Sequence, residues 1–421
     1  MKKTLSFLLI VCLLICLFAG CQNQAEEPID EPDNPIVDPT QPEEPDKPKE
    51  PNPKYDLCDS SEFLMFKPVV SVRDGEYEIW ITAQYSGIYS IVIGDESYTA
   101  TDDIADDGWN FFKCRIPQEK LDKTKIYAIC RTESENAKPK GVEFEFKPIE
   151  KTENINIYVS SDVHNKFNGT MKEYEYLGDD LDLIVCNGDF VSQIPNDYDV
   201  FKIIWFYGEL SQGRYPLVTA RGNHEYVEAD REHDRQGSEG SPQGYKAYNK
   251  YIAENGHDYY EFSVGPINGI VLDMFEGLDS VTFPGDDYSP FIARMQEQTE
   301  FIRNTTLDND KINIVISHVC PVNGGWFDSV AEEAEKWPEL LNDLGLEFMI
   351  CGHYHGNFIY QPNDERSSGP NNYPVIFGCT PIDIYDHCGI ALTVYKDKVD
   401  VAYVHSNLSI LDTATVDYPK H

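Results

Sequence analysis

The chain has few positive charges for its length. Its 421 residues include 34 lysines and arginines against 73 aspartates and glutamates, which gives a formal net charge of −39. A surface this acidic repels polyanions, so strong non-specific binding to nucleic acids is not expected. Carboxylates also bind divalent cations, although charge alone does not locate a site for them.

Long apolar runs are missing after residue 21, where no stretch is long enough to span a bilayer. The single long run, "LSFLLIVCLLICLFAG", follows Lys2 and Lys3 and ends directly before Cys21. A basic start, an apolar core and small residues at the end are typical of a secretory signal over residues 1–21. The ending "LFAGC" resembles a bacterial lipobox, which implies lipidation of Cys21, with a plain signal peptide or an uncleaved anchor as the alternatives. We therefore expect an extracytoplasmic protein of the bacterial cell envelope, attached to the membrane through Cys21.

Residues 22–54 lack aromatic side chains altogether. They contain nine prolines, ten acidic residues and three lysines, a composition that cannot bury enough apolar surface to fold. We expect an extended, disordered linker between the anchor and the folded part of the chain. The linker carries a charge of −7, so most of the negative charge belongs to the folded residues.

Cysteine is sparse outside the signal. Eight cysteines follow Cys21, and their spacing does not resemble a disulfide scaffold, although export would permit disulfides. A bridge between Cys114 and Cys130 is left open. Cys186 and Cys351 end apolar runs, where a cysteine usually behaves as a small buried hydrophobic residue.

Residues 55–149 gather no His, Asp or Glu residues into a site. Short aromatic and β-branched runs, such as "EYEIWITAQY" and "GVEFEFKP", alternate with Gly, Asp or Pro clusters. This pattern predicts an all-β sandwich of about seven strands, of the immunoglobulin or fibronectin type. Such a module is expected to act as a spacer or docking unit, with contact to glycans or the cell wall as an alternative.

From about residue 152 onward, predicted strands alternate with predicted helices. The strands are expected at 155–161, 181–187, 215–220, 269–275, 312–317 and 346–351, and the helices at 198–213, 289–306 and 328–345. Alternation of this kind predicts an α/β domain that binds its ligand at the carboxyl ends of the strands.

Metal-ligating side chains follow five of these strands. In chain order they are Asp162 and His164, then Asp189, then Asn223 with His224 and Glu225, then His318, and finally His353 and His355. A mixture of imidazole, carboxylate and amide groups suits Mn, Fe or Zn. Without His224 and Glu225 these are seven candidate ligands, which are too many for one ion and indicate two ions that share a bridging carboxylate. The other five histidines are expected at the surface or in ordinary structural roles, and they are His233, His257, His387, His405 and His421.

The ordered series D-x-H, G-D, G-N-H-E, a single H and G-H-x-H resembles the calcineurin-like metallophosphoesterase family over residues 152–407. The segment "QTEFIRNTTL" also resembles the helix that this family has between its third and fourth motifs. The resemblance implies a four-layer α-β-β-α sandwich, here preceded by the all-β domain and followed by a tail of residues 408–421. It also implies a hydrolase of phosphoric ester bonds, in which two divalent or transition metal ions activate a hydroxide that attacks phosphorus.

The roles of the family's residues carry over by position. Asp162, His164 and His355 would hold the first ion, and Asp189 would bridge both ions. The second ion would be completed by Asn223, His318 and His353. By the same resemblance, His224 would be catalytic near the leaving-group oxygen, and Glu225 would support the site by orienting an imidazole.

Purple acid phosphatases also place a β-sandwich before such a domain, but this sequence departs from their pattern. They carry a metal-binding tyrosine just after the bridging aspartate, where "GDFVSQ" offers Phe190 and Ser192. They also have glycine where His164 stands. A tyrosinate-bound iron site is therefore not expected.

The substrate stays open between phosphorylated small molecules and phosphorylated polymers. A phosphate or base pocket could draw on Arg221, Arg231, Arg235, Trp326 and Tyr354, each of which also fits a surface or packing role. Two other functions compete with catalysis: a glycan-binding adhesion protein with an inert phosphoesterase-like scaffold, and a protein that stores metal or uses it only structurally.

Overall fold

A computed structural model describes residues 54–106, 109–134, 136–226, 228–229, 240–241, 244–253, 257–274, 289–323, 331–383 and 386–419. The predicted signal, the linker up to residue 53 and the lipidation site Cys21 lie outside the described residues, as do Arg231, Arg235 and Trp326. Among the described residues, no helix is both long and apolar enough to cross a membrane.

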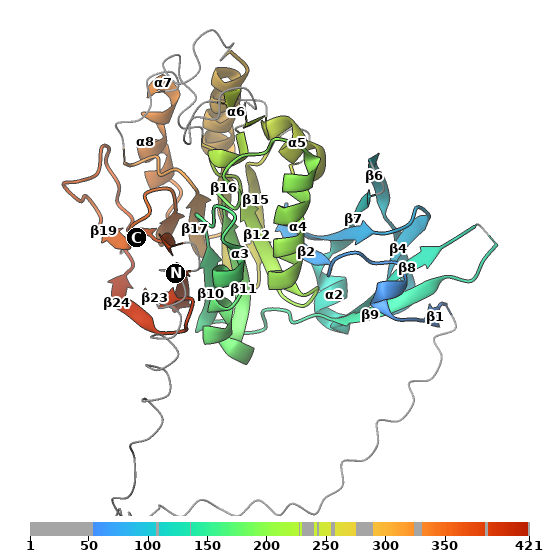
Figure 1. The fold of residues 1–421 in the computed structure, drawn as a ribbon. Helices are drawn as coiled ribbons and strands as arrows, with labels where there is room; N and C mark the ends of the chain where they lie inside the picture. Colours follow the sequence, from blue (N-terminus) through green and yellow to red (C-terminus); the bar gives the residue numbers. More distant parts are fainter. Residues whose placement is uncertain are drawn as a thin grey trace, which may run out of the picture. The chain divides into compact units, whose positions relative to one another are not determined.

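Two large sheets dominate the folded unit Pro51–His421 (Figure 1). The first has eleven strands, in the order β24 (Ile410–Asp417), β23 (Lys398–His405), β22 (Asp386–Val394), β10 (Ile155–Ser160), β11 (Leu181–Asn187), β12 (Pro216–Ala220), β2 (Val69–Arg73), β3 (Glu76–Ala83), β7 (Trp109–Pro117) and β6 (Thr101–Asp106), with β21 (Thr380–Asp383) paired to β22. The second has six strands, in the order β15 (Tyr260–Val264), β16 (Ile267–Leu272), β17 (Ile312–Ser317), β18 (Phe348–Cys351), β20 (Val375–Phe377) and β19 (Phe358–Tyr360).

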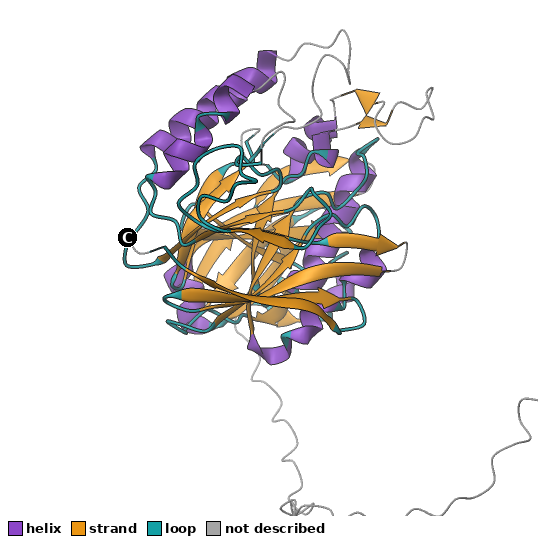
Figure 2. Ribbon diagram, turned by 90° about the vertical axis from the view of Figure 1, so that its left-hand side faces the viewer, coloured by secondary structure: helices purple, strands orange, loops and turns teal. Residues whose placement is uncertain are grey.

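Helices cover the outer faces of both sheets, so the layers run helix, sheet, sheet, helix (Figure 2). Within the described residues the helices are α2 (Gln118–Thr124), α3 (Phe167–Thr170), α4 (Asp197–Ser211), α5 (Gly244–Tyr251), α6 (Ser289–Asn304), α7 (Ala331–Ala334) and α8 (Trp337–Asn342). Helices α4 and α5 pack against the eleven-stranded sheet, and α6 and α8 pack against the six-stranded sheet. The predicted four-layer sandwich is therefore confirmed.

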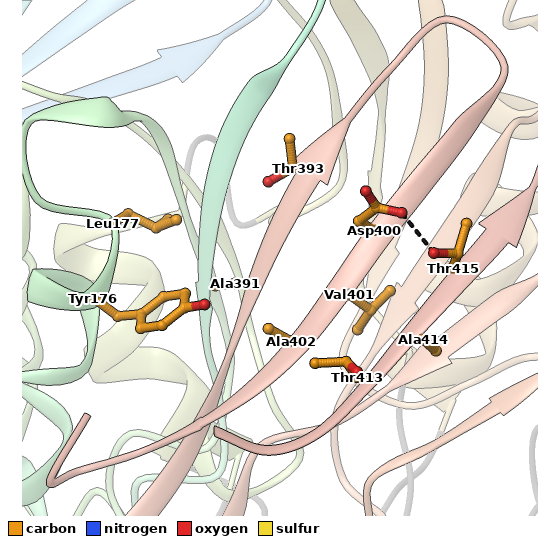
Figure 3. A pocket seen from close by; sticks show the side chains of 10 residues that line it. All are labelled: Tyr176, Leu177, Ala391, Thr393, Asp400, Val401, Ala402, Thr413, Ala414 and Thr415. Atoms are coloured by element: carbon orange, nitrogen blue, oxygen red, sulfur yellow. Dashed lines mark hydrogen bonds between the residues drawn. The ribbon is translucent and has the colours of Figure 1, made fainter. Parts of the chain in front are cut away.

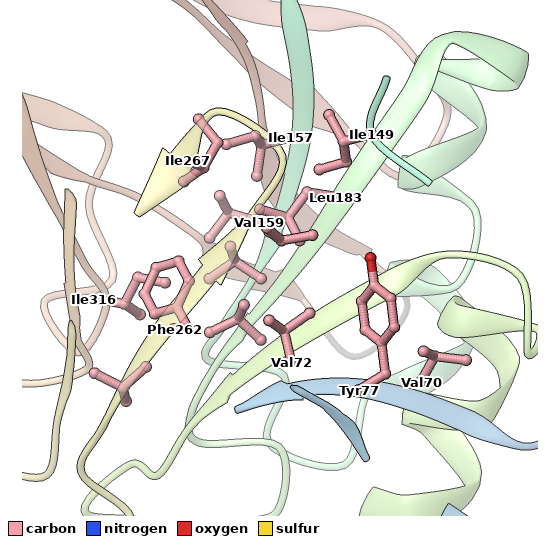
Figure 4. Packing of buried hydrophobic residues seen from close by; sticks show 14 of the residues in the cluster. Val70, Val72, Tyr77, Ile149, Ile157, Val159, Leu183, Phe262, Ile267 and Ile316 are labelled. Carbon is pink, nitrogen blue, oxygen red and sulfur yellow. The ribbon is translucent and has the colours of Figure 1, made fainter. Parts of the chain in front are cut away.

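The core between the two sheets explains why the central strands are apolar on both faces. Ile157 and Leu183 from the first sheet meet Phe262 and Ile316 from the second, as Figure 4 shows. The opposite faces of the same strands are buried under helices, for example at Ile184 on β11. Strands covered on both sides need continuous apolar runs, such as "LDLIVCN", rather than alternation.

The strands predicted as a separate N-terminal sandwich share a sheet with the α/β region. Strand β2 pairs in parallel with β12, with Pro216 opposite Val70 and Leu217 opposite Ser71. The N-terminal strands β2, β3, β7 and β6 thus form one half of the eleven-stranded sheet. A separate five-stranded sheet packs against this half. That sheet contains β1 (Asp56–Leu57), β9 (Lys140–Glu145), β8 (Ile126–Thr132), β4 (Ile88–Ile93) and β5 (Glu96–Thr99). The structure joins the two regions that the sequence analysis separated.

One predicted helix is broken. The segment 328–345 contains α7 and α8 with an interruption between them, and its first residues, 328–330, are not described. Pro338 lies in the first turn of α8, where its missing N–H is tolerated, whereas the same ring inside a continuous helix would clash with the preceding turn.

A groove of about 380 Å³ lies on the outer face of strands β22, β23 and β24 (Figure 3). Tyr176 and Leu177 border it on one side, and the strands contribute hydroxyl groups and the carboxylate of Asp400, which accepts a hydrogen bond from Thr415 Oγ1 at 2.7 Å. None of the candidate metal ligands lines this groove.

The eight cysteines after Cys21 are all free, and all are buried except the half-buried Cys58. Cys114 and Cys130 lie in different sheets, on β7 and β8 respectively. They do not form the bridge that the sequence left open.

The shared sheet predicts that residues 54–419 unfold as one cooperative unit. Ile79 of β3 and Ile314 of β17 both lie in the core between the sheets. Either Ile79→Ala or Ile314→Ala should lower the free energy of unfolding by about 2–5 kcal/mol. Calorimetry should show one transition that both substitutions shift to lower temperature. Two transitions, with each variant shifting a different one, would instead indicate two independent domains.

Candidate metal centre

The predicted ligands meet where the carboxyl ends of both sheets come together. Strands β10, β11 and β12 are parallel neighbours in the first sheet, and β17 and β18 are parallel neighbours in the second. Parallel neighbours end at the same edge, so the residues after them are brought side by side. All seven predicted ligands follow one of these five strands.

The first group of side chains joins Asp162, His164 and His355. The Nε2 atoms of His164 and His355 lie 3.1 Å apart, and His355 Nε2 lies 3.1 Å from Asp162 Oδ1. The Asp162 carboxylate also accepts the backbone N–H of His353 at 3.0–3.1 Å. Two imidazole nitrogens and a carboxylate oxygen therefore converge on one point.

The second group joins Asp189, His318 and His353. His318 Nε2 lies 3.0 Å from Asp189 Oδ2, and its Nδ1 donates to the Asn187 carbonyl at 2.6 Å. That donation places the ring hydrogen on Nδ1 and turns Nε2 toward the centre. Asn223 Oδ1 lies 3.0 Å from His353 Nδ1, which adds an amide to the same group.

Asp189 lies between the two groups. Its Oδ2 is 3.8 Å from His164 Nε2 as well as 3.0 Å from His318 Nε2. The side chain is buried, and its Oδ1 accepts the backbone N–H of His224 at 2.9 Å. The family resemblance implies a bridging carboxylate at this position between the two ligand clusters.

Five of the seven predicted ligands have a left-handed backbone conformation. Their φ angles are 55° at Asp162, 45° at His164, 57° at Asp189, 70° at His353 and 48° at His355. Residues other than glycine adopt this conformation at a cost of about 1–2 kcal/mol each. Strain gathered in this way is typical of functional sites, where the fold holds side chains in directions that an extended strand would not give.

Two motif glycines allow the strand ends to approach one another. A Cβ on Gly222 would lie 2.1 Å from Asp189 Oδ1, and a Cβ on Gly352 would lie 2.2 Å from Ser161 Oγ and 2.8 Å from Asp162 Oδ2. Any side chain at either position would displace a predicted ligand.

The carboxylate of Glu225 accepts hydrogen bonds from backbone N–H groups rather than from an imidazole. Its buried carboxylate accepts the N–H groups of Asp189 and Gly222 at 2.9 Å and of Phe190 at 2.8 Å. The prediction that it orients a histidine ring is therefore corrected, because its oxygens are occupied by the loop after β11. It is a positioning residue for the bridging aspartate and does not face the centre.

His224 lies at the edge of the centre, with 27% of its side chain exposed. Its Nδ1 is 2.7 Å from the carbonyl oxygen of Ser192, so Nδ1 carries a hydrogen and Nε2 faces inward, 3.9 Å from Asp189 Oδ2. Burial lowers the pKa of His224, but the Asp189 carboxylate and the bond to Ser192 outweigh burial and raise it above the ordinary value.

The buried carboxylates of the centre favour positive charge beside them. Burial by itself lowers the pKa of His318, yet the carboxylates of Asp189 and Asp162 raise it to about 10. At His164 burial outweighs the same two carboxylates, and the neighbouring imidazoles of His224 and His355 add to it, so the pKa falls to about 4. Two buried carboxylates that draw a proton onto an imidazole offer the same attraction to a cation, so the side chains present fit two metal ions.

Arg221 has a structural role. It is fully buried, donates through Nε to Asp273 Oδ1 at 3.1 Å and pairs with the other oxygen of Asp273. Of the two roles that the sequence left open for Arg221, the structure supports the packing role, because its charge is already neutralised by Asp273 inside the protein. Tyr354 is half-buried, and its hydroxyl donates to the Asn323 carbonyl at 3.2 Å.

The fold and this ligand arrangement agree with comparisons to known proteins. Residues 155–357 match the family model described as calcineurin-like phosphoesterase. The chain contains a calcineurin-like phosphoesterase domain. It is a hydrolase of phosphoric ester bonds with a dinuclear metal centre, and the identity of the metal is open.

Two solved structures resemble the phosphoesterase chain in fold. A purple acid phosphatase, PPD1, from seeds of yellow lupin (Lupinus luteus) has a TM-score of 0.57 and 14% identity, covering 83% of this chain and 73% of its own. PhoD has a TM-score of 0.51 and 11% identity, covering 84% and 88% respectively. Both similarities extend beyond the phosphoesterase domain. A search of curated proteins found no match.

Three residues at or behind the first ligand loop were not predicted from the sequence. Ser161 Oγ lies 2.8 Å from Asp162 Oδ2, and His387 and Glu173 form a buried pair behind it. Ser161 immediately precedes a predicted ligand, a position that would have justified attention. His387 and Glu173 are 214 residues apart, and no local pattern joins them.

The close approach of Gly222 predicts that a methyl group there disrupts metal binding. Gly222→Ala should push Asp189 away and weaken metal affinity at least tenfold, measured by calorimetric titration of Mn²⁺ into apoprotein. Gly75→Ala is the control, since a Cβ there meets nothing within 4 Å and its φ of 77° adds only backbone strain, in the turn between β2 and β3. Unchanged affinity in Gly222→Ala would show that Asp189 does not bind the metal from this position.

Proposed function

We propose that this chain is an extracytoplasmic, membrane-anchored phosphoesterase that hydrolyses phosphomonoesters or phosphodiesters. The observation that carries the catalytic part is the position of Asp189 between two ligand clusters, with His224 at their open edge. The signal-like residues 1–21 and the linker support the proposed location.

The two clusters fit one ion each. The first ion would be held by Asp162, His164 and His355. The second ion would be held by Asn223, His318 and His353, and Asp189 would bind both ions. When bound, such an ion pair lowers the pKa of water and neutralises charge on phosphate oxygens. The strained loops and the Glu225 carboxylate keep the ligand side chains in place before any substrate arrives.

His224 is the residue placed to handle a proton. Its Nδ1 is held by the Ser192 carbonyl, so only Nε2 can exchange a proton with a group at the centre. A protonated Nε2 can donate to the oxygen that leaves phosphorus, which stabilises the departing alkoxide. Its partial exposure lets a substrate reach it.

The substrate class and the role of the N-terminal strands belong to the same proposal. We expect the substrate to be a phosphorylated small molecule or polymer outside the cytoplasm. Contact with glycans or the cell wall through residues 55–149 remains a prediction. The complete ligand set favours catalysis over an inert adhesion scaffold, and the inward-facing Nε2 of His224 favours it over metal storage.

Substitutions at His224 and Asp189 separate catalysis from metal binding. His224→Ala should lower kcat by about 10²–10⁴-fold, because it removes only the proton donor, while metal content stays at two ions per chain. Asp189→Ala should lose metal and turnover together. The measurements are steady-state kinetics and elemental analysis of the purified variants. An Asp189→Ala protein with full metal content and full rate would contradict the dinuclear centre.

A substrate panel tests the activity itself. Chromogenic phosphomonoesters and phosphodiesters should be hydrolysed in the presence of Mn²⁺ or Zn²⁺, and a chelator should abolish the hydrolysis. His405→Ala is the matched control for His224→Ala, since His405 is also a histidine but pairs with Asp386 away from the centre. Failure on every ester, combined with tight glycan binding, would favour the adhesion function.

Cell fractionation tests the proposed anchor. The wild-type chain should be found in the membrane fraction, and Cys21→Ser should abolish lipid attachment, which metabolic labelling with a palmitate analogue detects. Equal labelling of both proteins would contradict lipidation at Cys21.

A further inference from the structure

A fully buried polar cluster lies behind the first ligand loop. It consists of Glu173 on the 3₁₀ turn η2 (Glu173–Tyr176), His387 on β22, and Tyr158 on β10. His387 Nδ1 is 3.0 and 3.1 Å from the two oxygens of Glu173, and the Tyr158 hydroxyl donates to Glu173 Oε2 at 2.8 Å. None of these residues belongs to the predicted ligand set.

The other ring nitrogen of His387 points at the ligand loop. His387 Nε2 lies 2.7 Å from the carbonyl oxygen of Ser161, which only accepts hydrogen bonds, so Nε2 is the donor. With Nδ1 against a carboxylate, the ring is held at both ends. Burial lowers the pKa of His387, but Glu173 outweighs burial and raises it above its ordinary value.

A gain in stability does not account for a buried pair of this kind. Moving two charges out of water is costly, and apolar residues of similar size often stabilise a core equally well. Space around the pair is also tight, since a Cβ on Gly389 would lie 2.4 Å from Glu173 Oε2. A specific contact that the pair maintains therefore accounts for it better, and the contact available is the Ser161 carbonyl.

The Ser161 carbonyl belongs to the peptide bond that leads into Asp162. The N–H of that same peptide donates to the Gly188 carbonyl at 3.1 Å, so both polar groups of the peptide are fixed, one by β22 and the other by the loop after β11. Asp162 follows with a φ of 55°, which fixes the direction of its carboxylate. A free peptide at this point would let the carboxylate rotate away from His355.

We propose that His387 and Glu173 are positioning residues that orient the Asp162 carboxylate for the first metal ion by clamping the Ser161–Asp162 peptide. This inference rests on the proposed function, because it assumes that Asp162 binds an ion. The pair is assigned to the first ion alone. Among the described residues, the side chains of the second cluster contact neither His387 nor Glu173.

Calorimetric titration of Mn²⁺ into the full-length apoprotein, kept well below the unfolding temperature of each variant, tests the inference. The binding step that His355→Ala removes identifies the first ion, since His355 belongs only to that group. His387→Ala should weaken this step about 10–100-fold and change the other step less than threefold. His387→Gln, whose amide can still donate to the Ser161 carbonyl, should recover most of the loss. Glu173→Gln should weaken the first step by less than His387→Ala.

His405→Ala is the matched control. His405 forms a similar pair with Asp386, at 2.7 Å, on the neighbouring strand, and it does not contact Ser161. This variant should lower the unfolding temperature without changing either binding step. If His387→Ala leaves both steps unchanged, or weakens both equally without rescue in His387→Gln, the positioning role is wrong and the pair is merely structural.

The titration together with the ester assay separates this inference from the proposed function. If wild-type protein binds two ions and hydrolyses esters while the His387 and Glu173 variants bind normally, only the positioning role fails. If wild-type protein binds no ion and turns over no ester, the proposed function and the positioning role both fail. Should His387→Ala not fold, His387→Gln and Glu173→Gln give the comparison.

Discussion

The arrangement of the candidate metal centre depends on two buried carboxylates, which lie at the ends of neighbouring parallel strands. Asp162 and Asp189 are removed from water and held near each other, which is unfavourable unless positive charge lies between them. His318 lies beside both, with Nε2 3.9 Å from the Asp162 carboxylate and 3.0 Å from the Asp189 carboxylate. Metal ions at the same place would satisfy both carboxylates more fully, and the imidazoles on the surrounding loops then become ligands.

The surrounding structure keeps these charges in place at a cost in conformational strain. Five predicted ligands adopt left-handed backbone angles, and glycines at 222 and 352 let the loops touch. The Glu225 carboxylate fixes the loop that carries Asp189, and the His387–Glu173 pair reaches the peptide before Asp162. Each carboxylate of the centre thus has its own support from outside the ligand set. The rigid sheets on both sides make this strain tolerable.

Much of this arrangement could be predicted from the sequence, because strand ends leave local signals. Buried parallel strands are continuous apolar runs, and the polar residues after them must gather at one edge, which located Asp162, Asp189 and His318 correctly beside one another. Non-local pairing left no such signal: nothing in β2 shows that it pairs with β12, so the two regions seemed separate. The roles of Arg221 and His387 depended in the same way on distant carboxylates, at Asp273 and Glu173. A broken helix at Pro338 was, by contrast, foreseeable from the proline itself.

Anomalous X-ray diffraction from crystals of the wild-type protein grown with Mn²⁺ measures the number and the positions of the bound ions directly. A dinuclear centre bridged by Asp189 predicts two peaks about 3.5–4 Å apart. One should lie within coordination distance of Asp162, His164 and His355, the other within that of Asn223, His318 and His353, and both beside Asp189. A single peak, or peaks away from these side chains, would contradict a dinuclear centre bridged by Asp189.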